Sequence, residues 1–549
     1  MRKWLNFFNA RSNTVVSAAA LLGVMTMTSR LMGVVRDRLL SSTFGAGQEL
    51  DAYYAAFRAP DFVYSLFVYG VITGGFIPVL TAHLAKDGGK VAADKRAWDF
   101  TSLVLSFIGI VLIVLAVLGA IFARPVVAAF TPGFAPGQVD LTASLARLMF
   151  LSPVLLGLSG ILGGLLQTFK RFTIFATAPL LYNAGIIFGA LVLAPSMGIP
   201  GVALGVVLGS FCHCLIQYFG CRAMGFRFRF IFNFRDKGLL TIGRLMVPRT
   251  ASMAVNHVNL IILTAIASTI GVGSISVFNL ANNLQSFPIN ILGVSFAVAA
   301  FPFITELAAR DKRKELAGSF AKTVRAVLFL IIPATVAFLL LRAQIVRVIL
   351  GAGRFDWADT IATADTLAYF TLSLFAQALL PLVIRVFLAF QDAATPLVVG
   401  VIAVFIERLV AWHFVNIGLG TAGLALAFSA GSVLNLAVLW VLLRVKVGGL
   451  EEGGIFRAVA VMSACALFMA MATQGVKIYL GSLVNMRSFL GIFTQGAVAG
   501  VFGLAVYFGL ALALGSQEAK YIVGLLRRRT APVPASVEIE QKGASIEAE

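Results

Sequence analysis

The chain has 549 residues, of which 59% are hydrophobic and only 12% are charged, whereas an ordinary soluble protein is about 45–50% apolar and about 25% charged. These proportions exclude a soluble enzyme, because so few charges cannot cover a folded surface of this size. Lysine and arginine outnumber aspartate and glutamate by 43 to 24, for a net charge of +19. Such a basic excess is typical of nucleic-acid binding, but the cytoplasmic loops of a polytopic membrane protein also produce it.

The apolar residues form long segments, and about 20 such residues are enough for one membrane-spanning helix. Glycine, proline or charge separates segments near residues 14–42, 53–84, 98–123, 140–168, 173–194, 200–221, 240–270, 275–308, 319–341, 360–389, 394–416, 420–443, 455–480 and 486–515. We therefore predict an all-α polytopic membrane protein with about fourteen transmembrane helices.

The basic residues favour one orientation of these helices. With the N-terminus inside, the inner loops carry Lys86, Lys90, Lys95, Arg96, Lys170, Arg171, the basic residues of 222–237, those of 310–314, Arg444 and Lys446. The outer links at 43–52, 195–199, 271–274 and 417–419 carry none, and Arg124, Arg342, Arg347, Arg354, Lys477 and Arg487 are scattered exceptions. The positive-inside rule then predicts that both termini are cytoplasmic.

The same pattern divides the chain into regions. We expect a cytoplasmic N-terminus at 1–13, without the features of a removable signal peptide. Two groups of six helices follow at 14–221 and 240–446, joined by a cytoplasmic loop at 222–239, and two more helices occupy 447–515. A cytoplasmic tail at 516–549, which ends rich in Pro, Ser, Glu and Ala, is predicted to be disordered.

The sequence contains no motif typical of a metal site, a cofactor site or an enzyme active site. Cys212, His213 and Cys214 are consecutive, so on a helix they point in different directions and cannot converge on one ion. The GAG strings at 45–47 and 351–353 lack the Lys-Ser/Thr of a phosphate loop, and HExxH and GxSxG are missing. We predict no metal, no cofactor and no catalytic activity.

The segment FRFRFIFNFR at 226–235 alternates phenylalanine with arginine. Basic patches with interleaved aromatic residues bind single-stranded nucleic acid. A juxtamembrane position explains the pattern better, with phenylalanines in the interface and Arg227, Arg229 and Arg235 facing anionic headgroups. We expect membrane lipids as partners here, and no nucleic acid.

Ionisable residues within apolar segments are costly, so they indicate a cavity or a partner. The first helix contains Arg30, Arg36, Asp37 and Arg38, and the second contains Arg58. Arg30 and Arg36 are six residues apart, which places them roughly 120° apart around a helix, and both can border one broad cavity.

Arginine in a membrane cavity suits an anionic cargo, because its guanidinium stays charged and binds phosphate or carboxylate in bidentate fashion. Arg30, Arg36 and Arg58 are therefore candidate substrate-binding residues. Arg38 has the alternatives of snorkelling or pairing with Asp37. Asp51 is a candidate for the same site, with capping of the second helix as its alternative.

Several strings, in chain order, resemble the signatures of the MurJ/MviN lipid II flippases of the MOP (MATE-like) exporter superfamily. They are SRLMGVVRD (29–37), FGAG (44–47), DAYYAAFRAPDF (51–62), GGFIPVL (74–80), TPGF (131–134), RFTIFATAPLLYNAGI (171–186), FRFRFIFNFRDKGL (226–239), FPINILGVSFAVAAFP (287–302) and RVFLAFQDAATP (385–396). The resemblance covers roughly residues 14–515.

The resemblance implies two six-helix lobes in pseudo-twofold relation around a central cavity, with the last two helices forming a groove for a polyprenyl tail. It implies that the protein flips lipid II, a lipid-linked peptidoglycan precursor, to the outer leaflet of the bacterial inner membrane by alternating access. Ser29, Arg30, Arg36 and Asp51 match functional positions of the family, and Arg58 stands where the family usually has lysine. We expect a monomer, with the cell-wall synthesis machinery as a further partner.

The sequence also departs from the family pattern. Tyr64, Ser65 and Tyr69 stand where the family has a basic pair and an acid, and Asn282 and Asn283 replace an Asp-Arg pair. Leu263 lies near the expected position of a sodium-site acid. Tyr64 and Asn283 are therefore further candidate site residues.

Three charges are additions: Arg249 after Pro248, and the pair Glu407 and Arg408. Arg249 is a candidate replacement for a lost positive charge, with snorkelling as the alternative. The departures leave two other functions open, transport of a different polyprenyl-diphosphate-linked sugar and small-solute antiport. A non-transporting scaffold is a third.

Overall fold

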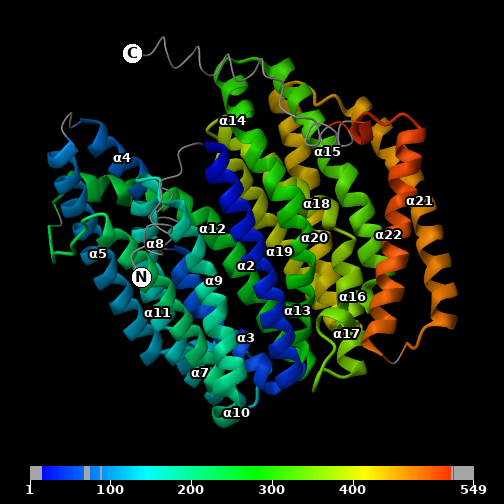
Figure 1. The fold of residues 1–549 in the computed structure, drawn as a ribbon, viewed down its shortest axis with the longest axis horizontal. Helices are drawn as coiled ribbons and strands as arrows, with labels where there is room; N and C mark the ends of the chain where they lie inside the picture. The colour runs from blue at the N-terminus through cyan, green and yellow to red at the C-terminus, as the bar shows by residue number, and fades with distance from the viewer. Residues whose placement is uncertain are drawn as a thin grey trace.

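The computed structural model describes residues 15–66, 75–86, 90–233, 235–486, 488–520 and 524, without the side chains of 15–20, 83–86, 90–94, 245, 247–249 and 251–253. The expectations for the segment 1–13, for Tyr69, for the side chain of Arg249 and for most of the C-terminal tail lie outside these residues. Within them, every regular element is a helix (Figure 1).

The first half of the chain forms helices that pack side by side (Figure 1). They are α2 (Val15–Phe44), α3 (Gln48–Tyr64), α4 (Ile77–Lys86), α5 (Lys90–Ile121), α6 (Ala123–Phe130), α7 (Pro136–Met149), α8 (Leu151–Thr168), α9 (Phe172–Phe188), η3 (Gly189–Leu193), α10 (Ala194–Met197) and α11 (Ile199–Ala223).

The second half continues with longer helices and one further π-helical segment. They are α12 (Lys237–Ile270), α13 (Ser274–Pro288), η4 (Ile289–Val294), α14 (Ser295–Ala309), α15 (Arg313–Leu340), α16 (Arg342–Ile349), α17 (Trp357–Thr371), α18 (Leu374–Ala389), α19 (Ala394–Asn416), α20 (Gly420–Val447), α21 (Glu452–Leu483) and α22 (Phe489–Ala513).

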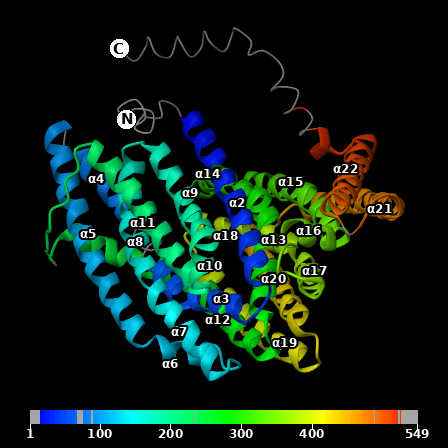
Figure 2. The ribbon, with the colours of Figure 1, turned by 60° about the horizontal axis from the view of Figure 1, so that its bottom comes forward.

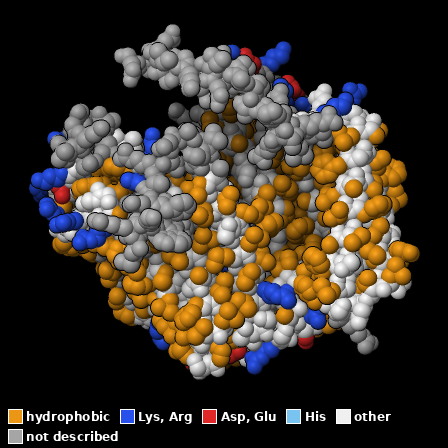
Figure 3. Space-filling model, in the orientation of Figure 1, with side chains coloured by type: hydrophobic (Ala, Val, Ile, Leu, Met, Phe, Trp, Pro, Cys, Tyr) orange, Lys and Arg blue, Asp and Glu red, His pale blue; other side chains and the backbone are white. Residues whose placement is uncertain are grey.

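The apolar character of these helices supports a multi-pass membrane protein. Ten helices of the described chain are long and apolar enough to cross a bilayer, or eleven if the bent pair α17 and α18 is one span. Figure 3 shows hydrophobic side chains over the visible face, with Lys, Arg, Asp and Glu gathered toward its edges. The predicted all-α membrane architecture is therefore confirmed, while the count of fourteen spans stays a prediction.

The buried apolar side chains form three clusters. One contains residues from both halves of the chain, including Leu40 and Leu50 of the first half and Phe278, Val346 and Phe370 of the second. We name the end of the molecule at this shared cluster the closed end; α2 ends and α3 begins there.

At the other end, where α2 begins, the two halves have separate clusters. Phe76, Phe100 and Leu165 belong to the cluster of the first half, and Phe320 and Leu382 belong to that of the second. We name this the open end. The halves are therefore joined by apolar packing mainly at one end of the molecule (Figures 1 and 2).

Helix α12 connects the two halves. Its first turns pack with the first half, because Leu239 and Ile242 belong to the cluster of Phe76 and Phe100. Its last turns reach the shared cluster through Leu263 and neighbouring residues.

Candidate functional site

Ser29 and Arg36 of α2 are brought together by Asn183 of α9. The Arg36 guanidinium donates from Nε and Nη2 to Oδ1 of Asp37 at 3.0 and 2.8 Å, and from Nη1 to Oδ1 of Asn183 at 3.3 Å. Nδ2 of Asn183 in turn donates to Oγ of Ser29 at 3.2 Å. This arrangement holds Arg36 in one orientation while its side chain stays 24% exposed.

Arg30 lies on the same helix and is half-buried. It forms no hydrogen bond or ion pair with the described residues, so its five donors are available to a ligand. Arg38 behaves differently, because it donates to the backbone carbonyls of Val348 and Ile349 at the end of α16. Arg38 therefore does not pair with Asp37, which binds Arg36, while snorkelling of Arg38 stays a prediction.

Arg58 of α3 contacts the second half of the chain. Its Nε donates to Oγ1 of Thr264 in α12 at 2.7 Å, and its Nη2 donates to Oδ1 of Asn279 in α13 at 2.6 Å. Both hydrogen-bond partners are neutral, and the charge of Arg58 interacts instead with the carboxylate of Asp61. Asp61, one turn further along α3, is half-buried.

Asp51 does not cap its own helix. Helix α3 begins at Gln48 after Gly47, which places Asp51 inside the first turn, so the capping alternative is wrong. Its buried carboxylate instead accepts from Gly273 N at 2.6 Å, from Ser276 N at 2.7 Å and from Ser276 Oγ at 2.6 Å. These groups form the N-terminus of α13, so Asp51 caps a helix of the other half and joins the halves at the closed end.

Asn283 of α13 forms another contact between the halves. Its Nδ2 donates to Oδ2 of Asp37 at 3.0 Å, so Asp37 binds Arg36 with one oxygen and the second half with the other. A cavity of about 200 Å³ lies at this contact between α2 and α13, lined also by the apolar side chains of Leu31, Phe287 and Phe338.

The remaining candidate residues form no hydrogen bond with Arg30, Arg36 or Arg58 in the described chain. Tyr64 is half-buried and borders a small cavity together with Asp61. Glu407 is 4% exposed between α12, α19 and α20, and its only hydrogen-bond partner in the described chain is Nδ2 of Asn259, at 3.2 Å. Arg408 is exposed on α19. We name Arg30, Arg36 and Arg58, with the side chains that bond to them, the arginine cluster. Ser29 and Asn283 join it through Asn183 and Asp37, whereas no hydrogen bond of the described chain links Asp51, Glu407 or Arg408 to it.

The sequence did not indicate Asn183, Thr264 or Asn279 as members of this site. An amide or hydroxyl within an apolar helix is a weak signal, because such groups also bond to their own helix, as Asn279 does to the carbonyl of Ile275. Only the packing of α3 against α12 and α13 makes Thr264 and Asn279 partners of Arg58, and only the packing of α2 against α9 makes Asn183 a partner of Arg36.

Helices α21 and α22 lie at one edge of the molecule, away from α5 (Figures 1 and 2). A cavity of about 670 Å³ lies between α15, α18, α20 and α21, with a mainly apolar lining that includes Ile332, Trp440 and Phe456. Its volume and apolar lining suit part of a hydrocarbon chain.

Known families and proteins are similar to this chain over most of its length. The family model described as lipid II flippase MurJ matches residues 40–494. The lipid II flippase MurJ of Burkholderia cenocepacia is 30% identical over 440 residues, which are 79% of this chain and 83% of that protein. The probable lipid II flippase MurJ of Vibrio cholerae is 26% identical over 92% of this chain and 97% of its own length.

Solved structures share the fold. A lipid II flippase MurJ in an inward closed conformation superposes with a TM-score of 0.72 and 22% identity, covering 89% of this chain and 99% of that one. An inward-facing MATE-family multidrug transporter of the MOP superfamily gives a TM-score of 0.65 at 17% identity, covering 79% and 99%. By the extent of the family match, the chain belongs to the lipid II flippase MurJ family.

Proposed function

We propose that this protein flips lipid II, the lipid-linked peptidoglycan precursor, from the inner to the outer leaflet of the bacterial inner membrane. The family membership supports the substrate, and the observation that carries the proposal is the arginine cluster between the two halves of the chain. Arg30 has no partner in the described chain, and the hydrogen-bond partners of Arg58 are neutral, with Asp61 as its neighbouring acid. A diphosphate is an anion that such guanidinium groups bind well.

The two halves correspond to the two lobes of an alternating-access transporter in this proposal. Residues 14–221 and 240–446 form the lobes, the loop 222–239 joins them, and 447–515 supply the groove for the polyprenyl tail. Both termini lie in the cytoplasm, so the open end faces the cytoplasm and the closed end faces the outside. The diphosphate then enters from the open end and binds at the arginines.

Release to the outside requires the contacts at the closed end to break. Asp51 has all its observed bonds in one of these contacts, so we assign it to the gate and not to the diphosphate. Ser29 and Asn283 position Arg36 through Asn183 and Asp37. Tyr64 borders the small cavity beside Asp61, and we assign it to a contact with the sugar of the head group.

The membrane potential is the proposed driving force. An inside-negative voltage favours outward movement of an anion by about 2.3 kcal/mol per charge per 100 mV. The same voltage favours return of the unliganded arginines toward the cytoplasm. Loss of the potential should therefore stall transport in vesicles.

Complementation of a flippase-depleted bacterium tests the function. The wild-type chain should restore growth, and the double variant Arg30→Ala/Arg36→Ala should not, at equal levels in the membrane. Arg124→Ala is a matched control, because Arg124 is an exposed residue paired with Asp140 at the closed end. Rescue by the double variant would overturn a transport role for the arginines and would favour a scaffold.

A second assay separates substrates. Purified protein in vesicles is given lipid II or a polyprenyl-diphosphate that carries a different sugar. Faster translocation of the latter would replace the proposed substrate with the alternative one. We further expect the protein to act as a monomer beside the cell-wall synthesis enzymes, which crosslinking in cells would test.

A further inference from the structure

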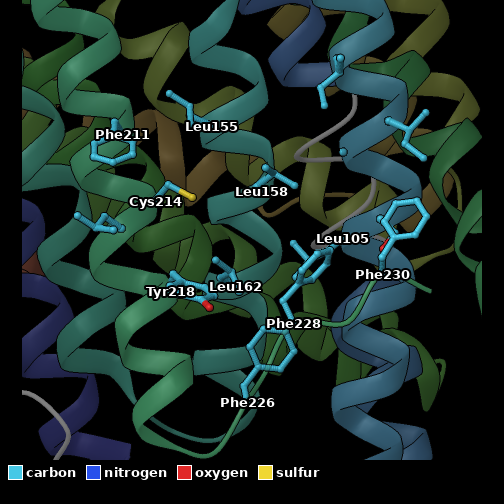
Figure 4. A pocket seen from close by; sticks show the side chains of 15 residues that line it. Leu105, Leu155, Leu158, Leu162, Phe211, Cys214, Tyr218, Phe226, Phe228 and Phe230 are labelled. Atoms are coloured by element: carbon cyan, nitrogen blue, oxygen red, sulfur yellow. The ribbon is translucent and has the colours of Figure 1, made fainter. Parts of the chain in front are cut away.

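An apolar groove lies on the first half of the chain, and none of the residues that line it belongs to the arginine cluster. Its volume is about 370 Å³, and α5, α8, α11 and the connection from α11 to α12 form its walls. Leu105 comes from α5, Leu158 and Leu162 come from α8, and Phe211 and Tyr218 come from α11, while Phe228 of the connection lies between α5 and α11 (Figure 4). Several of these side chains are open to the outside, since Phe211 is 50% and Phe228 is 46% exposed.

The connection between α11 and α12 forms the edge of this groove in an extended conformation. The amide of Arg229 donates to Oγ of Ser102 at 3.4 Å, and the amide of Ile231 donates to Oγ of Ser106 at 3.3 Å. Two residues of an extended chain advance by about 6.6 Å, and four residues of a helix advance by about 6.0 Å. The two serines of α5 therefore match the spacing of alternate amides, and they hold the segment against the helix.

This attachment explains the alternation of phenylalanine and arginine in the connection. In an extended chain, side chains two residues apart lie on the same face. Phe226, Phe228 and Phe230 all line the groove (Figure 4). Arg227 and Arg229, which alternate with them, are exposed.

The rim of the groove is strongly basic. Within residues 95–99 and 222–237 of the described chain, seven lysines and arginines stand against two aspartates. One of these, Asp236, is the N-cap of α12 and accepts from the amide of Leu239 at 3.0 Å. Arg227 and Arg229 form no ion pair with the described residues. Figure 3 shows the basic side chains gathered at this edge of the molecule.

We propose that the groove is a binding site for an anionic phospholipid of the surrounding membrane. The acyl chain lies between α5, α8 and α11, and the phosphate binds at Arg227 and Arg229. The rise per residue places Ile113 about 12 Å along the axis from Leu105, which is most of the roughly 15 Å depth of one hydrocarbon leaflet. The unpaired cations at the mouth select the anionic headgroup over a zwitterionic one.

The occupant is a bulk lipid and not the transported substrate. The groove opens at the edge of the molecule formed by α5, whereas α21 and α22 lie at the opposite edge (Figure 2). The inference depends only on the membrane location of the chain, so its failure leaves the proposed transport function intact.

Quenching of tryptophan fluorescence by brominated lipids tests the site. The ring of Trp98 lies 5.8 Å from that of Phe226, so it reports on the mouth of the groove. The full chain is prepared with Trp98 as the sole tryptophan, by Trp4→Phe, Trp357→Phe, Trp412→Phe and Trp440→Phe. It is then placed in vesicles that contain a small fraction of phosphatidylglycerol or phosphatidylcholine with brominated acyl chains.

The anionic brominated lipid should quench more strongly at equal mole fraction, and unlabelled phosphatidylglycerol should reverse the quenching. The pair Arg227→Gln/Arg229→Gln should reduce the apparent preference by on the order of tenfold. The matched control, Arg310→Gln/Lys314→Gln, removes two charges at the open end of the other half and should leave the preference unchanged.

A second variant tests the acyl-chain part of the site. Cys214 lines the groove, and Cys214→Phe fills it, so quenching by both lipids should fall. Equal quenching by the two lipids in the unaltered groove would overturn the proposal. So would a preference that survives loss of Arg227 and Arg229, or quenching that is unaffected by Cys214→Phe.

Discussion

Asp37 and Asn283 connect the arginine cluster to the opposite half of the chain. One carboxylate oxygen of Asp37 holds Arg36 at 2.8 Å, and the other accepts from the Asn283 amide at 3.0 Å. A change in the separation of α2 and α13 therefore acts directly on the carboxylate that orients Arg36. This relationship couples the position of a candidate substrate-binding group to the opening between the halves.

A double-mutant cycle on these two residues should reveal the coupling. We expect Asn283→Ala to lower the free energy of unfolding by about 1 kcal/mol and Asp37→Ala to lower it by more, because Arg36 then loses its acid. The interaction energy should be about 0.5–1.5 kcal/mol, measured by unfolding in detergent. As a control, a cycle of Asp37→Ala with Asn290→Ala should give no interaction energy, because the Asn290 side chain bonds to the carbonyl of Ser286 in its own segment. Additive effects in the first cycle would contradict the contact.

Asp51→Asn should weaken the closed end. The substitution keeps the shape but removes the charge from hydrogen bonds to three donors, and bonds of a charged group contribute about 1.5–3 kcal/mol. Spin labels can be attached on a cysteine-free background at Ala135, an exposed position just before α7, and at Ala358, an exposed position in α17. We expect the distance between these two labels to become longer in Asp51→Asn. Asp140→Asn, an exposed acid of the first half, is the control. Identical distance distributions in the two variants would exclude the assigned gate role.

Gly273→Ala should prevent the closed end from packing as it does here. A Cβ atom at Gly273 would lie 2.2 Å from the carbonyl oxygen of Ala46, and the backbone φ is +86°. Gly418 has a φ of +88° and open space around it, so Gly418→Ala carries the same backbone strain of about 1 kcal/mol without the clash. The melting temperature should fall clearly further for Gly273→Ala. Equal losses would show that the approach of α13 to the α2–α3 turn is unimportant.

The pair Asp392 and Lys446 should make stability depend on acid at the open end. The hydrogen bond from Lys446 holds the pKa of Asp392, in the α18–α19 connection, below its usual value. A lowered pKa in the folded state gives stability that is present above the unfolded pKa of about 3.9 and is lost as pH falls through the folded value. The pair is partly exposed, so we expect about 0.5 kcal/mol.

Asp392→Asn should therefore lower the melting temperature slightly at pH 7 and have less effect near pH 3. Asp311→Asn is a suitable reference, because Asp311 is paired with Arg313 at a more exposed position. A loss for Asp392→Asn that is the same at both pH values would argue against an ionic contribution.

The sequence predicted the helical segments well because their apolar runs are long. It also directed attention to Arg36 and Arg58, because a charge within such a run needs a compensating environment. It did not predict the short helices α6 and α16, which lie in segments expected as outer links. These helices bring Val127 and Val346 into the shared cluster, so tertiary packing stabilises them.

The partners of the charges were not predictable from the sequence. Asp51 looked like a local cap because it precedes an apolar run, yet its donors are Gly273 and Ser276, more than 200 residues away. Capping preferences describe a helix and its own flanking residues. They carry no information about a second helix whose N-terminus arrives by folding.

The shared apolar cluster sets an energetic condition on any conformational cycle. Separating the halves at the closed end exposes side chains such as Leu50 and Phe278, which are almost fully buried. Each 100 Å² of apolar surface moved into water costs about 2.5 kcal/mol, so an outward-open state needs a similar area to be covered where the clusters are now separate. The free energy gained by burying apolar surface at one end thus offsets the cost of exposing it at the other end. A small molecule bound between the two separate clusters at the open end would keep them from packing together. It would therefore arrest the protein without contacting any arginine.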